Sequence, residues 1–369
     1  MTIKLSQFLY IRTDANTHIG TGHIMRCIAL GQAWQDEGGK VVFISHCESE
    51  KLRERIIKEG FELVTIDRPH PHPSDLELTL STIRNISHSQ SHLSLKQDTF
   101  TPSPSSVLPP PSSIWVVLDG YHFTSEYQKA IRDAGIRLLV IDDMNHLPYY
   151  HADIILNQNI HATELKYNCA PDTRLLLGTK YVLLRREFLK YKDFKREIPE
   201  KARKILVTMG GADPDNVTLK VIQALNLLND PELEVKVVIG PSNPHIESIK
   251  KELNLSPFTF HILQGTDDMP SLMAWADLAI SGGGSTCWEL LYMELPSILL
   301  ELSEDQHDIV KHLVRIKCFH KAKLTKEADT IILLNSLINN PELRNRQKSI
   351  IIDGEGTKRT IKEVTNESI

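Results

Sequence analysis

The chain has 369 residues with a formal net charge of −5, and 41% of its residues are hydrophobic. This length exceeds the usual size of one domain and supplies enough apolar residues for two cores, so we expect two domains. The acidic balance and the lack of any long Lys/Arg run exclude the basic surface that nucleic-acid binding requires. No stretch has the length of a membrane span, and no signal-peptide pattern follows Lys4, so the sequence predicts a soluble cytoplasmic protein.

The five cysteines are odd in number and widely spaced, and no two form a Cys-x-x-Cys pair. This pattern indicates reduced thiols and disfavours a structural zinc site. The histidines between residues 70 and 92 lie among prolines and serines, without carboxylates at a ligand spacing. We therefore expect no metal site and no cofactor.

Residues 19–27 place a histidine where a glycine-rich loop enters an amphipathic helix. Residues 8–13 predict a short buried strand before this loop, and apolar residues recur at helical spacing after it. Gly20 and Gly22 allow close backbone approach, and the free N–H groups of the helix start favour a phosphate. We expect His23 to act as a base near pH 7, with a helix cap or a backbone hydrogen bond as its alternative role.

Short apolar strands alternate with helical patterns along the chain, which predicts an α/β fold with parallel sheets. Residues 88–113 interrupt this alternation with serines and prolines, and we expect a mobile surface insertion there. The alternation restarts after a charged segment. The resulting prediction is a Rossmann-like domain at residues 1–188, a linker at 189–204 and a second Rossmann-like domain at 205–369, with a ligand in the cleft between the domains.

A second glycine-rich loop follows a predicted strand and opens a helix at residues 281–289. Its amide groups and the hydroxyls of Ser285 and Thr286 can face a diphosphate. Glu289 lies about one and a half turns into the helix and is expected to accept hydrogen bonds from ribose hydroxyls, with an exposed helical charge as the alternative. Neither loop has the spacing of a P-loop, which disfavours ATP-driven phosphoryl transfer.

With both loops in place, the chain resembles the UDP-sugar hydrolase family of the pseudaminic acid pathway. That family is related to MurG-like glycosyltransferases, so the resemblance implies the GT-B fold, in which two Rossmann-like domains face each other across a cleft. The similarity runs nearly end to end. It rests on the order and spacing of residues 19–27, 117–121, 141–143, 156–159, 184–188, 209–213 and 283–289.

The resemblance implies hydrolysis of UDP-2,4-diacetamido-2,4,6-trideoxy-β-L-altropyranose at the sugar C1–O bond with inversion, which releases UDP and the free sugar without a metal. An inverting attack needs a water opposite the leaving diphosphate and a base that takes its proton. His23 matches the catalytic histidine of the family and fits this role. Tyr121 matches a tyrosine near the reacting centre. Asp14 is the expected orienting partner of His23, and shaping of the turn is its alternative role.

Further positions are expected to bind the UDP-sugar. Asp305 and Gln306 correspond to a polar pair that relatives place against the sugar, although a helix N-cap is the alternative for Asp305. Gly120 departs from the family, which more often has a histidine before the tyrosine. The expected substrate-binding residues are Gly20, Gly22, Arg26, Asn157, Asn159, Gly210, Gly211, Gly283, Gly284, Ser285, Thr286, Glu289, Asp305 and Gln306.

Two other functions remain open at this point. A MurG-like glycosyltransferase would transfer the same sugar to an acceptor hydroxyl, and a non-catalytic UDP-sugar-binding protein would keep the phosphate loops without needing His23. The Gly-His-x-x-Arg-Cys run and the lack of an apolar, basic docking segment favour the hydrolase. In each case the expected partner is a small-molecule UDP-sugar, and we expect a monomer.

Overall fold

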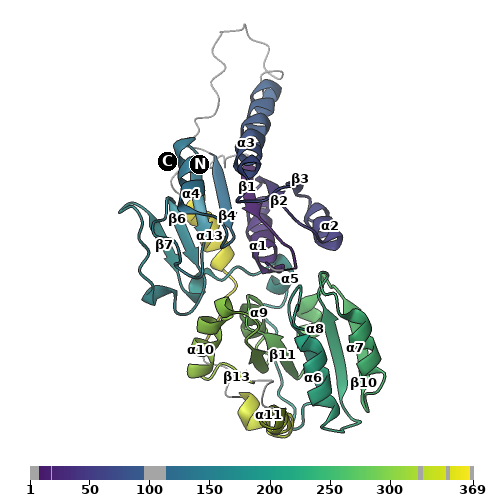
Figure 1. The fold of residues 1–369 in the computed structure, drawn as a ribbon. Coiled ribbons are helices and arrows are strands. Elements are labelled where there is room, and N and C mark those ends of the chain that lie inside the picture. The colour runs from purple at the N-terminus through teal and green to yellow at the C-terminus, as the bar shows by residue number, and fades with distance from the viewer. Residues whose placement is uncertain (1–7, 18, 95–113, 323–326, 346–349, 366–369) are drawn as a thin grey trace.

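The computed structural model describes residues 8–17, 19–94, 114–322, 327–345 and 350–365, which form two α/β domains (Figure 1). Among these residues, no helix is both long enough and apolar enough to cross a membrane.

The first domain is built on a seven-stranded parallel sheet with the order β3-β2-β1-β4-β5-β6-β7. Its strands are β1 (Phe8–Thr13), β2 (Lys40–Ser45), β3 (Glu62–Thr65), β4 (Trp115–Asp119), β5 (Arg137–Ile141), β6 (Ile154–Asn157) and β7 (Arg174–Leu177). Its helices are α1 (Gly22–Asp36), α2 (Glu50–Lys58), α3 (Pro73–Ser94) and α4 (Ser125–Asp133), with short 3₁₀ turns η2 (Ala162–Glu164) and η3 (Thr179–Tyr181).

The second domain contains a six-stranded parallel sheet with the order β10-β9-β8-β11-β12-β13. Its strands are β8 (Lys204–Thr208), β9 (Glu234–Ile239), β10 (Thr259–Gln264), β11 (Leu278–Gly282), β12 (Ser297–Leu300) and β13 (His320–Lys321). Its helices are α6 (Val217–Asn226), α7 (Ile246–Leu253), α8 (Met269–Trp275), α9 (Thr286–Tyr292), η4 (Glu304–Gln306), α10 (His307–Arg315), α11 (Glu327–Asn339) and α12 (Pro341–Asn345). The predicted α/β fold with two Rossmann-like domains is therefore confirmed.

The central strands of the first sheet are apolar along nearly their whole length because helices cover both faces of the sheet. Every residue of β1 and of β4 is buried. Alternate side chains of β1 enter different cores: Leu9 and Ile11 pack with the cluster that includes α1, and Phe8 and Tyr10 with the cluster that includes α4. This double burial holds the ends of β1 and β4 in fixed positions.

The segment between the domains is anchored to the second one. It begins with α5 (Arg186–Leu189) and continues to Arg196, whose buried guanidinium donates hydrogen bonds to three backbone carbonyls of the second domain. Such a buried cation is stabilised by carbonyl oxygens in place of water. The expected linker at 189–204 is therefore packed against a domain along part of its length.

The last helix, α13 (Gly356–Thr365), returns to the first domain (Figure 1). Its apolar side chains Ile361 and Val364 join the same core cluster as α1. A side chain at Gly356 would collide with the backbone of Val182, so glycine permits this close approach. The expected boundary of the second domain, 205–369, is wrong at its end, because this amphipathic helix buries its apolar face on α1.

Helix α3 extends to Ser94, so the expected break in the alternation of strands and helices does not begin at residue 88: residues 88–94, the start of the expected mobile surface insertion, are helical. The sequence contains no proline between Pro73 and Pro102, and Ser, Gln and His residues are tolerated inside helices. Residues 95–113 of the predicted insertion lie outside the described residues.

Candidate active site

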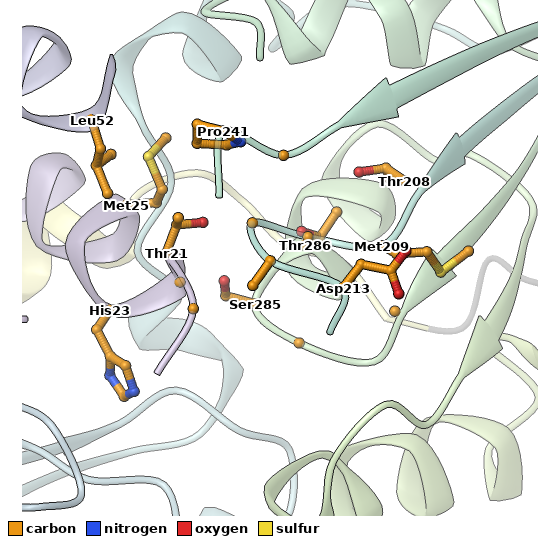
Figure 2. A pocket seen from close by; sticks show the side chains of 18 of the residues that line it. Thr21, His23, Met25, Leu52, Thr208, Met209, Asp213, Pro241, Ser285 and Thr286 are labelled. Carbon is orange, nitrogen blue, oxygen red and sulfur yellow. The ribbon is translucent and has the colours of Figure 1, made fainter. Parts of the chain in front are cut away.

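A cleft of about 1090 Å³ lies between the two domains and is lined by both glycine-rich loops. Doubly wound folds bind ligands at this position, outside the carboxyl ends of their strands. Figure 2 shows Thr21 and His23 on the side of the first domain, with Ser285, Thr286 and Asp213 contributed by the second.

The first loop lies against the second glycine-rich loop and against the turn at Gly210 and Gly211, which follows β8. A Cβ at Gly22 would lie 3.5 Å from Ser285 Oγ, and a Cβ at Gly211 would collide with the Thr21 side chain. Gly210 has a φ of 79°, in the region that favours glycine. The expected loop residues of both domains therefore meet around one space.

His23 lies in the first turn of α1, and its Nδ1 is 2.7 Å from Oδ1 of the buried Asp119, the last residue of β4. Arg26 donates to both oxygens of this carboxylate, from Nε at 2.7 Å and from Nη2 at 2.6 Å. Burial would raise the pKa of Asp119, but Arg26 and His23 outweigh it, and the pKa lies well below its usual range.

The ionised Asp119 sets the tautomer of His23. A carboxylate only accepts hydrogen bonds, so Nδ1 carries the proton and Nε2 of the neutral ring keeps its lone pair. Arg26 Nη2 also lies 3.2 Å from Nδ1, but its contact with the carboxylate is the shorter one. The ring lines the cleft, so this geometry suits a base.

Asp14 does not contact His23, so its expected role as the orienting partner is wrong. Its carboxylate pairs with Arg12, accepts the backbone N–H of His46 at 2.6 Å and lies 2.9 Å from Nε2 of His122. The reason is topological: β1 and β4 are neighbours, and the loop after β1 carries His23 across the sheet edge to the end of β4.

Tyr121 lies beside His23, as expected, with the two ring centroids 4.8 Å apart in an edge-to-face arrangement. Its hydroxyl donates to Oδ2 of Asp143 at 2.8 Å, and Arg26 pairs with the same carboxylate. Burial and the nearby Asp143 both raise the pKa of Tyr121 well above its ordinary value, so the hydroxyl remains a donor. Asn159 also donates to Asp143, at 2.9 Å.

In the second domain, Glu289 lines the cleft, and its Oε1 accepts a hydrogen bond of 2.8 Å from Arg185. Burial raises the pKa of Glu289, whereas Arg185 opposes this effect. Gln306 accepts hydrogen bonds from the backbone N–H groups of Gly283 at 3.0 Å and of Leu302 at 3.1 Å, which holds the second loop. Asp305 lines the cleft beside it.

Three expected substrate contacts lie behind the cleft wall. They are Asn157, Asn159 and Gly283, none of which lines the cleft. Asn157 and Asn159 are buried, and Asn157 donates to the Tyr167 hydroxyl and accepts from the backbone N–H of Asn159. Gly283 lies against α10, where a Cβ would collide with Val310. The other predicted site residues that line the cleft are Gly20, Gly22, His23, Arg26, Tyr121, Gly210, Gly211, Gly284, Ser285, Thr286, Glu289, Asp305 and Gln306.

The sequence-based set of site residues omitted Asp119, Asp143, His122 and Arg185. A signal existed for the first two, because each follows a predicted strand, and the carboxyl ends of parallel strands share one edge of the sheet. No comparable local pattern in the sequence indicates that His122 or Arg185 belongs to the site.

Comparisons with known proteins agree with this architecture. Residues 204–339 match the glycosyltransferase family 28 C-terminal domain. MurG of Acinetobacter baumannii superimposes with a TM-score of 0.60 at 16% identity, covering 98% of this chain and 99% of that one. The MnaA–UDP structure from S. aureus superimposes with a TM-score of 0.62 at 13% identity, covering 98% of this chain and 96% of that one. The chain is thus an α/β protein with the GT-B fold.

Relatives found by sequence similarity give a narrower comparison than the solved structures do. The chain is 25% identical over 244 residues to the UDP-2,4-diacetamido-2,4,6-trideoxy-beta-L-altropyranose hydrolase of Campylobacter jejuni, covering 65% of this chain and 72% of that protein. It is 27% identical over 308 residues to an uncharacterized Methanocaldococcus jannaschii protein, covering 81% of this chain and 56% of that protein. It is 25% identical over 184 residues to the spore coat polysaccharide biosynthesis protein SpsG of Bacillus subtilis, covering 49% of this chain and 54% of that protein. The chain spans little more than half the length of these last two relatives. The resemblance to the UDP-sugar hydrolases of the pseudaminic acid pathway is confirmed.

Proposed function

We propose that this protein hydrolyses UDP-2,4-diacetamido-2,4,6-trideoxy-β-L-altropyranose at the sugar C1–O bond with inversion. The observation that carries the proposal is the His23–Asp119 pair, which faces a cleft lined by two glycine-rich loops. The relatives from Campylobacter jejuni and Helicobacter pylori are named for hydrolysis of this compound.

In the proposed reaction, Nε2 of His23 accepts a hydrogen bond from a water that lies opposite the UDP group. The water oxygen forms a bond to C1 while the C1–O bond breaks, and the electron pair of that bond stays on the diphosphate. His23 takes the proton, and the charge of Asp119 stabilises the resulting imidazolium. The products are UDP and the free sugar with inverted C1.

The second loop has the chemistry for the leaving group. Backbone N–H groups near Gly284 and the hydroxyls of Ser285 and Thr286 line the cleft and suit a diphosphate. The Glu289 carboxylate lines the same cleft, and in this proposal it accepts hydrogen bonds from the ribose hydroxyls. UDP is a stable leaving group, so neither a strong acid nor a metal is required in this proposal.

The test is release of UDP from this donor without an acceptor and with a chelator, for the intact protein and for His23→Ala. We expect kcat to fall about 10²- to 10⁴-fold in the variant. The affinity for UDP should be retained, because the loops hold the nucleotide. His261→Gln, which changes an exposed histidine paired with Glu234, is the matched control and should retain full activity.

A glycosyltransferase is the second candidate, since residues 204–339 match a glycosyltransferase domain. UDP release only after addition of an acceptor would favour it, and tight UDP binding without any turnover would favour a non-catalytic binding protein. Loss of activity with chelator would contradict the metal-free mechanism. The monomeric state and the cytoplasmic location stay predictions.

A further inference from the structure

Two histidine–aspartate pairs cross at one edge of the first sheet. His23 follows β1 and pairs with Asp119 at the end of β4, whereas His122 follows β4 and pairs with Asp14, which comes directly after β1. The two strands are neighbours, with Thr13 in register with Asp119. Each histidine therefore reaches the carboxylate of the other strand. The proposed reaction uses only the first pair.

The carboxylate of the second pair is also held by other groups. Asp14 is buried and also binds Arg12 and the backbone N–H of His46. Burial opposes its ionisation, but the hydrogen bond from His122 and the charge of Arg12 lower the pKa of Asp14 to about 2. Asp14 is therefore an acceptor at neutral pH, so Nε2 of His122 donates to it.

The remaining nitrogen of His122 is available to a ligand. In the neutral ring Nδ1 is an acceptor, and none of the described residues donates a hydrogen bond to it. The side chain is 23% exposed and lines the cleft next to Tyr121. Since Tyr121 packs against His23, the free acceptor belongs to the same side of the cleft as the base.

Gly120 makes room for this ring. A Cβ at position 120 would lie 2.7 Å from Cε1 of His122, closer than real Cβ atoms approach, and 3.0 Å from its Nδ1. The ring also packs against Phe123 in a tilted arrangement, with the two ring centroids 4.1 Å apart. The glycine that departs from the family pattern is thus the residue that allows His122 to occupy this place.

We propose that His122, positioned by Asp14, is a sugar-recognition residue whose Nδ1 accepts a hydrogen bond from an amide N–H or hydroxyl group of the sugar. This inference rests on the proposed function for the identity of the ligand. The diphosphate presents only acceptors and does not complement Nδ1, whereas each acetamido group supplies an N–H donor. The groups proposed to bind the diphosphate and the ribose, Ser285, Thr286 and Glu289, lie on the second domain, which leaves the face with His23 and His122 for the sugar.

The test compares two substitutions, each of which keeps one of the two hydrogen-bonding groups of the imidazole. His122→Gln keeps a donor close to the position of Nε2 and loses the acceptor, whereas His122→Asn keeps an acceptor close to Nδ1 and loses the bond to Asp14. Both are made in the His23→Ala background, so that the donor is not consumed. Calorimetry then gives the Kd for UDP and for the UDP-diacetamido sugar.

We expect His122→Gln to weaken binding of the UDP-sugar about tenfold, the equivalent of one good hydrogen bond, and to leave UDP binding within about twofold. His122→Asn should lose less affinity for the UDP-sugar, because it keeps the acceptor. His261→Gln is the control and should change neither affinity.

An equal loss of affinity for UDP and for the UDP-sugar would show a structural role and overturn the proposal. Unchanged UDP-sugar affinity in His122→Gln would also overturn it. If the intact protein does not hydrolyse the donor but His122→Gln still weakens only the UDP-sugar, the proposed function fails and the recognition role stands.

Discussion

The two glycine-rich loops have the same local construction but different surroundings. Each follows a parallel strand, β1 or β11, and leads into a helix, α1 or α9. On the first helix, His23 pairs with the buried Asp119, and Arg26 pairs with both Asp119 and the buried Asp143. The second carries a single acidic residue, Glu289, paired with Arg185.

This difference shows which part of the structure determines the chemistry. A strand–loop–helix unit creates a place for an anion in either domain. The end of the neighbouring strand differs between the two domains: in the first domain, the last residue of β4 supplies the carboxylate that pairs with the histidine of α1. Removing one partner of such a buried network costs about 3–5 kcal/mol, so the first loop should be the more sensitive of the two.

The largest expected effect comes from removing the partner that distinguishes the first loop. Asp119→Asn loses the charge that sets the tautomer of His23, and we expect kcat to fall about 10³- to 10⁴-fold, as comparable substitutions do in other histidine–aspartate pairs. UDP affinity should be retained. UDP release at saturating donor measures kcat, and circular dichroism confirms that the variant is folded.

Asp133→Asn is the control for this prediction, since it removes an exposed carboxylate paired only with Lys129 in the described structure. Its kcat should be unchanged. A kcat within threefold of the intact protein in folded Asp119→Asn would contradict the proposed pairing.

The next effect concerns Asp14, which stabilises the first domain in a way that depends on pH. The pKa of Asp14 is lowered from 3.8 to about 2 in the folded protein, so its stabilising contribution is present above pH 4 and is lost as the pH falls toward 2. We expect Asp14→Asn to lose ~2 kcal/mol of unfolding free energy at pH 7 and to show a shallower decline between pH 4 and 2. Urea unfolding at several pH values measures both, and parallel curves for the two proteins would reject the assignment.

A smaller effect is expected at the second loop. Glu289→Gln removes the charge proposed to bind the ribose, and we expect the Kd for UDP to rise about tenfold while kcat at saturating donor stays the same. Glu187→Gln is the matched control, because Glu187 also pairs with Arg185 but does not line the cleft. Equal effects of the two variants on UDP binding would show that Glu289 acts only through Arg185.

Much of the architecture could be predicted because it depends on short-range patterns. The alternation of strands and helices, both glycine-rich loops and the positions of His23 and Tyr121 were all visible in the sequence and are confirmed as parts of one cleft. Asp14 was assigned to the wrong histidine, because its position on the same loop as His23 suggested a local pair.

The sequence by itself determined the two parallel sheets, the phosphate-type loops and the histidine at the start of α1, since each follows from residues close together in the chain. Only the tertiary structure decided that His23 pairs with a carboxylate 96 residues away, that His122 takes Asp14, and that α13 packs on α1. These contacts depend on the strand order, which places β4 beside β1. A strand order is set by the packing of the whole sheet, so no local pattern specifies the partners that meet at its edge.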